Sequence, residues 1–336
     1  MKKPDFFIVG APKCGTTAMV HYLGTCPDIF MARKEMHHFG SDLRFGPQFY
    51  RRNLEEYLAE FEARKGQHCA GEGSVWYLYS RQAAAEIKAF NPDARIIIML
   101  RDPVEMLYSM YHTFRWDGNE HLPTFEEALA AQDERSAGRL LNRRTYFAQG
   151  LVYRDIVRFA EQVQRYFEVF GRDRVKVVIF DDFSADVPAT YRQILDFLGA
   201  DSANVRNDFR AVNTNKFVRS TALRTVMADP IVRSTVLAIR PLVPRAVFNA
   251  LQKVDARIRK FNSRAGKRPA LSPETRRQLQ REFAPEVERL STLLGRDLTH
   301  WCYDPGRGQG QVRTLERKRE AVPVSGHPDK AENLAA

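Results

Sequence analysis

The feature that most constrains the fold is the segment from Phe6 to Leu23, which reads FFIVGAPKCGTTAMVHYL. An apolar run comes first, a turn bounded by Gly10 and Gly15 follows, and the remainder repeats its apolar residues with helical spacing. A strand, a glycine turn and a helix in this order direct backbone N–H groups and the positive end of a helix dipole toward one point. We therefore predict an anion-binding loop at this first strand-to-helix junction.

The loop departs from the G-x-x-x-x-G-K-[ST] phosphate loop of nucleotide triphosphatases. Thr16 stands where the lysine is expected, and Lys13 lies inside the turn. The apolar run that ends at Leu100 is followed by Arg101 and only then by Asp102, so a cation comes first where a metal-binding carboxylate would stand. This pattern favours a ligand with an extra phosphate over a magnesium nucleotide, although a kinase or nucleotide hydrolase on the same fold stays open.

The rest of the chain alternates short apolar runs with helical patterns, which is typical of a parallel sheet buried on both faces. The predicted strands are Phe6–Val9, Cys69–Gly71, Arg95–Leu100 and Val175–Phe180. The predicted helices are Thr16–Leu23, Arg81–Phe90, Val104–Phe114, Phe125–Gln132, Tyr146–Phe170, Ala189–Leu198 and Pro273–Leu294. We therefore predict an α/β fold of three layers, like that of P-loop nucleotide hydrolases, with a central parallel β-sheet flanked by helices.

The net charge of +11 is concentrated in residues 206–268, where fifteen Lys or Arg residues face three Asp residues. Such a block attracts anions: a charged cofactor, an acidic acceptor, a lipid headgroup or nucleic acid. We predict one domain over residues 1–304, with the basic segment as a partly helical lid or a packed subdomain within it. Residues 305–336, rich in Gly, Pro and charge, are predicted to be a disordered tail.

Cysteine spacing and hydropathy limit the protein class. The four cysteines, Cys14, Cys26, Cys69 and Cys302, have no C-x-x-C spacing, which predicts neither a zinc site nor a disulfide framework. No apolar stretch approaches the roughly 20 residues that a bilayer demands, and no signal-peptide core follows the first lysines. We expect a cytoplasmic protein, with peripheral contact to a membrane surface through the basic segment left open.

Two segments resemble motifs of the sulfotransferases that use 3′-phosphoadenosine 5′-phosphosulfate (PAPS). The sequence FFIVGAPKCGTTAMVHYL is similar to the family's 5′-phosphosulfate loop, and RIIIMLRDPVEMLYSMYHTF resembles its 3′-phosphate motif. The similarity continues through GEGSVWYLYS, DRVKVVIFDDF and FAPEVERLSTLLGRDLTHW, and so covers about Asp5 to Trp301. The resemblance implies transfer of a sulfuryl group from PAPS to a hydroxyl or amine, leaving 3′,5′-adenosine bisphosphate (PAP), without a metal ion.

The resemblance also implies which residues bind the cofactor. Those assigned to the 5′-phosphosulfate are Lys13, Cys14, Gly15, Thr16 and Thr17. Among these, Lys13 is expected to contact the oxygen that bridges the 5′-phosphate and the sulfuryl group. Arg101 and Ser109 are expected to hold the 3′-phosphate. A basic loop with Lys267 and Arg268 either closes over the phosphates or is an ordinary surface loop.

The catalytic base is expected in the sequence KEMHHF, residues 34–39, which looks like the KE-x-H-F-F segment of heparan sulfate and related Golgi sulfotransferases. This match assigns the base to Glu35, while Lys13 stabilises the leaving group. The sequence departs from that pattern at His38, so His37 and His38 stay open as bases, since an unperturbed histidine titrates near pH ~6.5. Lys34 either assists Lys13 or is a solvated neighbour.

The acceptor and the competing functions stay open at this point. A carbohydrate, a glycolipid, a small hydroxylated metabolite or a peptide tyrosine all fit, because variable loops build acceptor pockets on this fold. Trp76 and Tyr77 belong either to the acceptor pocket or to the core. Besides the kinase, the competing class is a noncatalytic protein that binds anions or nucleic acid. No recognised nucleic-acid motif accompanies the basic block, so no specific nucleic-acid partner is expected.

Overall fold

The computed structural model describes residues 2–46, 53–201, 209, 216–218, 261, 263–265 and 268–302 of the 336-residue chain. Five parallel strands form one sheet in the order β2-β3-β1-β4-β5. Their bounds are Phe6–Gly10 (β1), Ile29–Met31 (β2), Cys69–Gly73 (β3), Arg95–Leu100 (β4) and Val175–Ile179 (β5). Because the strands run the same way, the segments that follow them gather at one edge of the sheet, which we call the carboxyl edge.

The sheet is buried on both faces, as the apolar runs predict. All five residues of β1 and the last five of β4 are buried. The register places Phe6 opposite Gly71 of β3 on one side and Arg95 of β4 on the other, so β1 is the central strand. A side chain at Gly71 would place its Cβ atom 2.1 Å from the ring of Phe6, so glycine leaves room for this core ring. The loop after β1 therefore starts at the middle of the carboxyl edge.

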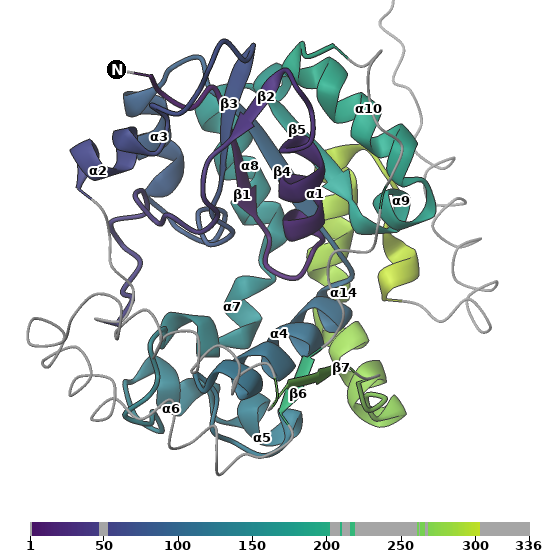
Figure 1. Ribbon diagram of the computed structural model, residues 1–336. Helices are drawn as coiled ribbons and strands as arrows, with labels where there is room; N and C mark the ends of the chain where they lie inside the picture. Colours follow the sequence, from purple (N-terminus) through teal and green to yellow (C-terminus); the bar gives the residue numbers. More distant parts are fainter. Residues whose placement is uncertain are drawn as a thin grey trace, which may run out of the picture.

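Helices form the two outer layers. On one face, α1 (Thr16–Leu23) and α10 (Val187–Leu198) are joined by a hydrogen bond of 3.1 Å from the Tyr191 hydroxyl to the Tyr22 carbonyl. On the other, α8 (Phe159–Phe170) packs against β4 and β5, with α3 (Ala83–Phe90) and α14 (Pro273–Leu294) against it. Figure 1 shows α1 in front of the sheet and α8 behind it. The predicted three-layer α/β fold is confirmed.

A second group of elements lies beyond the carboxyl edge, below the sheet in Figure 1. It consists of α4 (Pro103–Asp117), α5 (Phe125–Ala130), α6 (Gln132–Ser136), α7 (Tyr153–Ile156) and the antiparallel pair β6 (Lys216–Val218) and β7 (Ser263–Ala265). The remaining elements are α2 (Leu54–Ala59), α9 (Phe180–Ala185) and three single 3-10 turns, Gln149–Leu151, Arg172–Arg174 and Thr299–Trp301. None of the described helices is both long and apolar enough to cross a bilayer.

Helix boundaries follow their capping residues. Helix α14 begins where it was predicted, because the Ser272 hydroxyl accepts from the Thr275 amide at 3.2 Å and Pro273 occupies the first helical position. It ends before Gly295, whose φ of 64° is a left-handed conformation that suits glycine. Helix α1 also has the predicted bounds. The capping signal of Ser272 and Pro273 therefore located the start of α14.

The prediction of a single helix over Tyr146–Phe170 is wrong. The segment forms a 3-10 turn, α7 and α8, with breaks between them. Its start is held in a nonhelical conformation because Asn119 Oδ1 accepts hydrogen bonds from the amides of Tyr146 and Phe147, each at 2.9 Å. Asn119 is remote in sequence, so hydrophobic periodicity could not reveal this constraint.

The short elements were missed or misplaced. The strand predicted to end at Phe180 ends at Ile179, and Phe180 begins α9 instead. Strand β2 and helices α2 and α9 were not predicted, since three to six residues are too few to show a period. Most of the basic segment 206–268 and all of the predicted tail 305–336 lie outside the described residues.

Candidate active site

The turn between β1 and α1 follows a backbone path that favours glycine at two positions. Gly10 and Gly15 have φ angles of 152° and 87°. A Cβ atom at Gly10 would lie 2.7 Å from the Val75 carbonyl oxygen, and one at Gly15 would lie 3.0 Å from the Phe183 ring. Because Gly15 has no side chain to cap α1, the first N–H groups of the helix stay available to an anion. The strand, glycine turn and helix predicted for an anion-binding loop are therefore present.

Positive charge concentrates around this loop, in a cationic cluster formed by Lys13, Lys34, Arg101 and Arg268. Burial lowers the pKa of Lys13, and the charges of Arg268, Lys34 and Arg101 lower it further, while Asp117 opposes them. The Nη1 atom of Arg268 is buried and has no hydrogen-bond partner among the described residues. A buried donor without an acceptor costs free energy, and like charges repel. An anion with more than one phosphate would relieve both, so the site fits a phosphorylated ligand.

The residues predicted to read the 3′-phosphate lie at the end of β4 and on α4, the helix that follows it. Arg101 leaves the strand with its guanidinium over the Phe180 ring, 4.7 Å from the centroid, and 3.5 Å from Glu105 Oε2. Glu105 also accepts from Arg276 of α14. Ser109 is buried one turn after Glu105 on α4, so both lie on one helix face. Arg101 thus retains donors for a ligand at the start of α4.

A line of polar contacts connects the loop to Glu35. The Lys34 ammonium donates to Thr17 Oγ1 at 2.7 Å and lies 3.0 Å from Glu35 Oε1. Glu35 Oε2 accepts from the Val75 amide at 3.2 Å and lies 3.5 Å from His37 Nε2. The structure therefore brings the predicted base within two side-chain contacts of the anion-binding loop. Lys34 is the side chain that contacts both of them.

Glu35 and His37 have left-handed backbone conformations, with φ angles of 61° and 49°. Such conformations cost of order 1 kcal/mol or more in residues other than glycine, and they persist only where surrounding contacts enforce them. The Glu35 amide donates to the Gly73 carbonyl at 2.8 Å, and the His37 amide donates to Ser74 Oγ at 3.2 Å. The segment that carries the predicted base is thus held from β3 and the residues after it.

A buried carboxylate, Glu72, anchors these supports. It accepts hydrogen bonds from the Tyr57 hydroxyl at 2.7 Å, from the Tyr77 hydroxyl at 2.9 Å and from Ser74. Tyr77 in turn accepts from the His38 amide at 2.9 Å. Burial raises the pKa of Glu72 to about 7, against these hydrogen bonds, which lower it. Glu72 is therefore a buried support beneath the segment that carries the predicted base.

Other predicted residues are placed less directly. The Cys14 thiol is buried and donates to the Pro12 carbonyl at 3.4 Å, and burial raises its pKa to about 12, so only its backbone can serve the ligand. The His38 ring stacks on Tyr57 with centroids 4.3 Å apart, in the aromatic core. Thr16 is buried. Lys267 lies outside the described residues.

Trp76 and Tyr77 belong to the core. The sequence had left open whether they line the acceptor pocket or pack in the core. Trp76 is 8% exposed and packs on Phe147 with centroids 4.5 Å apart, while Tyr77 is fully buried. Sequence reasoning missed Glu72 and Arg276. A charged residue inside an apolar strand could have drawn attention to Glu72, whereas nothing in the sequence indicates that Arg276 reaches Glu105.

Comparisons with known proteins agree with this geometry. A family model described as the sulfotransferase domain matches residues 3–234. Carbohydrate sulfotransferase 15 of Mus musculus is 27% identical over 248 residues, covering 58% of this chain and 43% of that protein. Heparan sulfate glucosamine 3-O-sulfotransferase 3B1 of the same organism is 28% identical over 196 residues, covering 58% of this chain and 46% of that protein. The chain thus spans less than half the length of these relatives.

A solved structure extends the similarity over more of the chain. The sulfotransferase from Alicyclobacillus acidocaldarius superposes with a TM-score of 0.66 at 30% sequence identity, covering 90% of this chain and all of that one. The family match alone includes more than half of the present sequence. The loop after β1, the cationic cluster and these comparisons together show that the chain belongs to the sulfotransferase family.

Proposed function

We propose that this protein transfers a sulfuryl group from PAPS to a hydroxyl or amine group of a carbohydrate acceptor. The observation that carries the proposal is the line of contacts from Thr17 through Lys34 to Glu35, which connects a carboxylate to the start of α1. The names of the two mouse relatives support a carbohydrate or glycolipid over a phenol or a peptide tyrosine.

The residues around the loop would hold the cofactor by charge and by backbone donors. Lys13 and the N–H groups at the start of α1 would bind the 5′-phosphosulfate, while Arg101, Ser109 and Arg268 would bind the 3′-phosphate. When bound, PAPS supplies an activated sulfuryl group with a phosphate as its leaving group. Lys13 would neutralise the charge that develops on that phosphate.

Glu35 is the base that the geometry supports best. Its side chain is 31% exposed, whereas that of His37 is 6% exposed and lies behind it. An acceptor hydroxyl can therefore approach Glu35, which takes the proton as the acceptor oxygen forms its bond to sulfur. Lys34 and the Val75 amide keep the carboxylate oriented through separate oxygen atoms. His37 then acts by positioning Glu35.

The test compares nucleotides by their effect on the melting temperature. PAP should raise it more than ADP does, without Mg²⁺, because Arg101 and Ser109 read the 3′-phosphate. The Arg101→Ala variant should lose most of this preference, since a charge-assisted hydrogen bond contributes about 1.5–3 kcal/mol. Arg174→Ala serves as the matched control, because Arg174 precedes β5 at the opposite edge of the sheet. Equal shifts from both nucleotides, or a strict need for Mg²⁺, would favour a kinase or hydrolase instead.

The basic segment supports a separate proposal about location. We propose a cytoplasmic location, and the charge of residues 206–268 supports contact with anionic membrane surfaces. This part of the proposal rests on composition, because most of the segment lies outside the described residues.

A further inference from the structure

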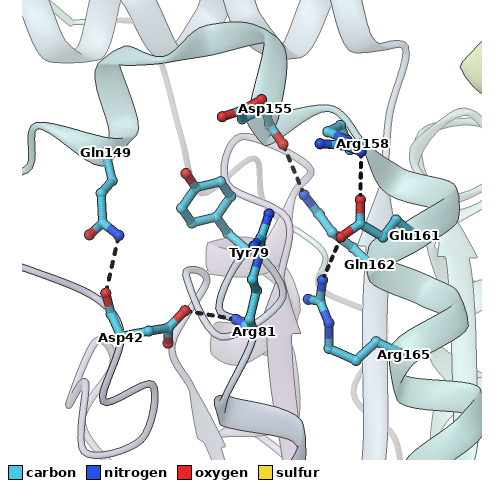
Figure 2. A pocket seen from close by; sticks show the side chains of 9 residues that line it. All are labelled: Asp42, Tyr79, Arg81, Gln149, Asp155, Arg158, Glu161, Gln162 and Arg165. Carbon is cyan, nitrogen blue, oxygen red and sulfur yellow. Dashed lines mark hydrogen bonds and ion pairs between the residues drawn. The ribbon is translucent and has the colours of Figure 1, made fainter. Parts of the chain in front are cut away.

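A polar cavity of about 280 Å³ shares no lining residue with the cationic cluster. Figure 2 shows its walls, which combine three arginines, three carboxylates, two amides and one tyrosine. None of these residues belongs to the predicted catalytic or cofactor-binding set. The volume is close to the lower end of the range for ligand pockets, roughly 300–1,000 Å³. The cavity is therefore of a size for a ligand of one six-membered ring.

One wall of the cavity comes from segments that follow β2 and β3 at the carboxyl edge, and the rest comes from the 3-10 turn Gln149–Leu151, α7 and the start of α8. Asp42 follows β2, while Tyr79 and Arg81 follow β3. Arg101 follows β4, on the other side of the central strand. Glu35 also follows β2, seven residues before Asp42, so chain length limits their separation to roughly 25 Å. The cavity and the proposed base thus share one loop.

Ring packing ties the cavity to the base. The His37 ring packs on Phe45 with centroids 4.6 Å apart, and Phe45 stacks on Phe147 at 4.5 Å. Phe147 contacts Tyr79, which lines the cavity, at 6.5 Å. The Gln149 amide fixes the same loop by donating to the Asp42 carbonyl at 3.1 Å. An acceptor that extends from Glu35 along this loop would reach the cavity.

Three polar side chains of the cavity wall are available to a ligand. The Tyr79 hydroxyl, the Arg81 guanidinium and the Asp155 carboxylate make no hydrogen bond to any described residue. They offer a group that can donate and accept, a donor and an acceptor, which together match the adjacent hydroxyls of a sugar. The tyrosine ring adds an apolar face for a pyranose.

The remaining charges of the wall neutralise one another. Glu161 lies 3.0 Å from Arg158 and 3.1 Å from Arg165, so both guanidinium groups already have a carboxylate partner. With three arginines against three acids, the cavity has no excess charge to attract a sulfate or phosphate. Its chemistry therefore favours a neutral ligand rich in hydroxyl groups.

We propose that this cavity binds a neutral pyranose ring of the acceptor, at a distance from the ring that is sulfated. The inference rests on the proposed function, because it takes the acceptor to be a carbohydrate. A second ring held here would orient a long acceptor at Glu35 and would favour oligosaccharides over monosaccharides. The affinity for PAP would not depend on it.

The experiment measures oligosaccharide binding to the PAP-loaded protein by calorimetry. The probes are chitohexaose, cellohexaose and an anionic hexasaccharide of alternating glucuronic acid and N-acetylglucosamine. Arg81→Ala, Tyr79→Phe and Asp155→Asn should each weaken binding of at least one neutral hexamer about five- to tenfold, at the 1–1.4 kcal/mol expected of one hydrogen bond. Arg174→Ala, at the opposite edge, should bind like the wild type. The melting temperature with PAP checks that each variant is folded.

The outcomes separate this inference from the proposed function. If neither neutral hexamer binds the wild type, or if all three cavity variants bind like the wild type, the cavity is not a sugar site. If only the anionic hexamer binds, the assignment of a neutral sugar as the ligand of the cavity is wrong. None of these results affects the preference for PAP over ADP, on which the proposed function depends. Loss of that preference in the wild type would instead overturn the function.

Discussion

Replacing Glu72 with Gln should change how stability depends on pH. Burial raises the pKa of Glu72 from its ordinary value of 4.5 to about 7 in the folded protein. A carboxyl group whose pKa is raised on folding contributes stability below pH ~4.5, and this contribution is lost as pH rises through about 7. The full difference corresponds to about 3 kcal/mol, at about 1.4 kcal/mol for each factor of ten.

Glutamine keeps the shape of the side chain and removes its titration. Its oxygen can accept from Tyr77 and Ser74, as Glu72 Oε1 does, and its NH₂ group can donate to the rotatable Tyr57 hydroxyl. Between pH 5 and pH 8 the free energy of unfolding of the wild type should therefore fall by about 2 to 3 kcal/mol relative to that of Glu72→Gln. Other titrating groups cancel in this difference.

Urea unfolding at half-unit steps of pH measures the effect. Glu62→Gln, a change at an exposed position, serves as the control. Its free energy of unfolding should depend on pH in the same way as that of the wild type. Tyr57→Phe should extend the loss of stability to higher pH, because the Tyr57 hydrogen bond lowers the pKa of Glu72. The free energy of unfolding of the wild type is compared with that of Glu72→Gln at each pH. If the difference between them changes by less than about 0.5 kcal/mol from pH 5 to pH 8, the assignment of the buried charge is refuted.

The remaining predictions concern the proposed chemistry and the basic segment. Glu35→Gln should lower turnover by roughly 10² to 10⁴ with PAP affinity nearly unchanged; if His37→Ala or His38→Ala abolishes turnover while Glu35→Gln does not, the base is a histidine. Lys13→Ala should weaken both turnover and PAP binding, measured by steady-state kinetics and calorimetry, because Lys13 acts on the leaving group and on the cofactor. Residues 206–268 should carry the protein onto anionic liposomes in sedimentation and release it as salt is raised, since such attraction is screened over ~8 Å at physiological ionic strength; binding that ignores salt would contradict this.

The sequence by itself determined the parts of the protein that depend on neighbouring residues. The last five residues of β4 are buried, and its apolar composition alone indicates a parallel strand that is covered on both faces. Gly10 and Gly15 bound a turn whose conformation suits glycine, and Ser272 and Pro273 start a helix through their own side chains. Such signals are local, and the structure bears them out.

The sequence also identified the candidate site residues, but it did not predict how they lie relative to one another. The likeness of KEMHHF to a family segment pointed to Glu35, and the departure from that pattern at His38 left His37 and His38 open as bases. Only the structure separates them, with Glu35 partly exposed, His37 buried behind it and His38 stacked on Tyr57. The difference arises because left-handed conformations at Glu35 and His37 redirect successive side chains, which no spacing rule predicts.

Tertiary structure alone decided the contacts between distant segments. Arg276 reaches Glu105 across 171 positions, and Asn119 breaks the predicted helix by binding amides 27 and 28 residues away. Glu72 supports the segment of Glu35 through Tyr57 and Tyr77, which precede and follow Glu72 in the sequence. Each of these groups is a polar side chain whose partner is fixed by how helices pack on the sheet. Periodicity and capping reflect interactions within a few residues. They therefore cannot predict hydrogen-bond partners that tertiary packing brings together from distant parts of the chain.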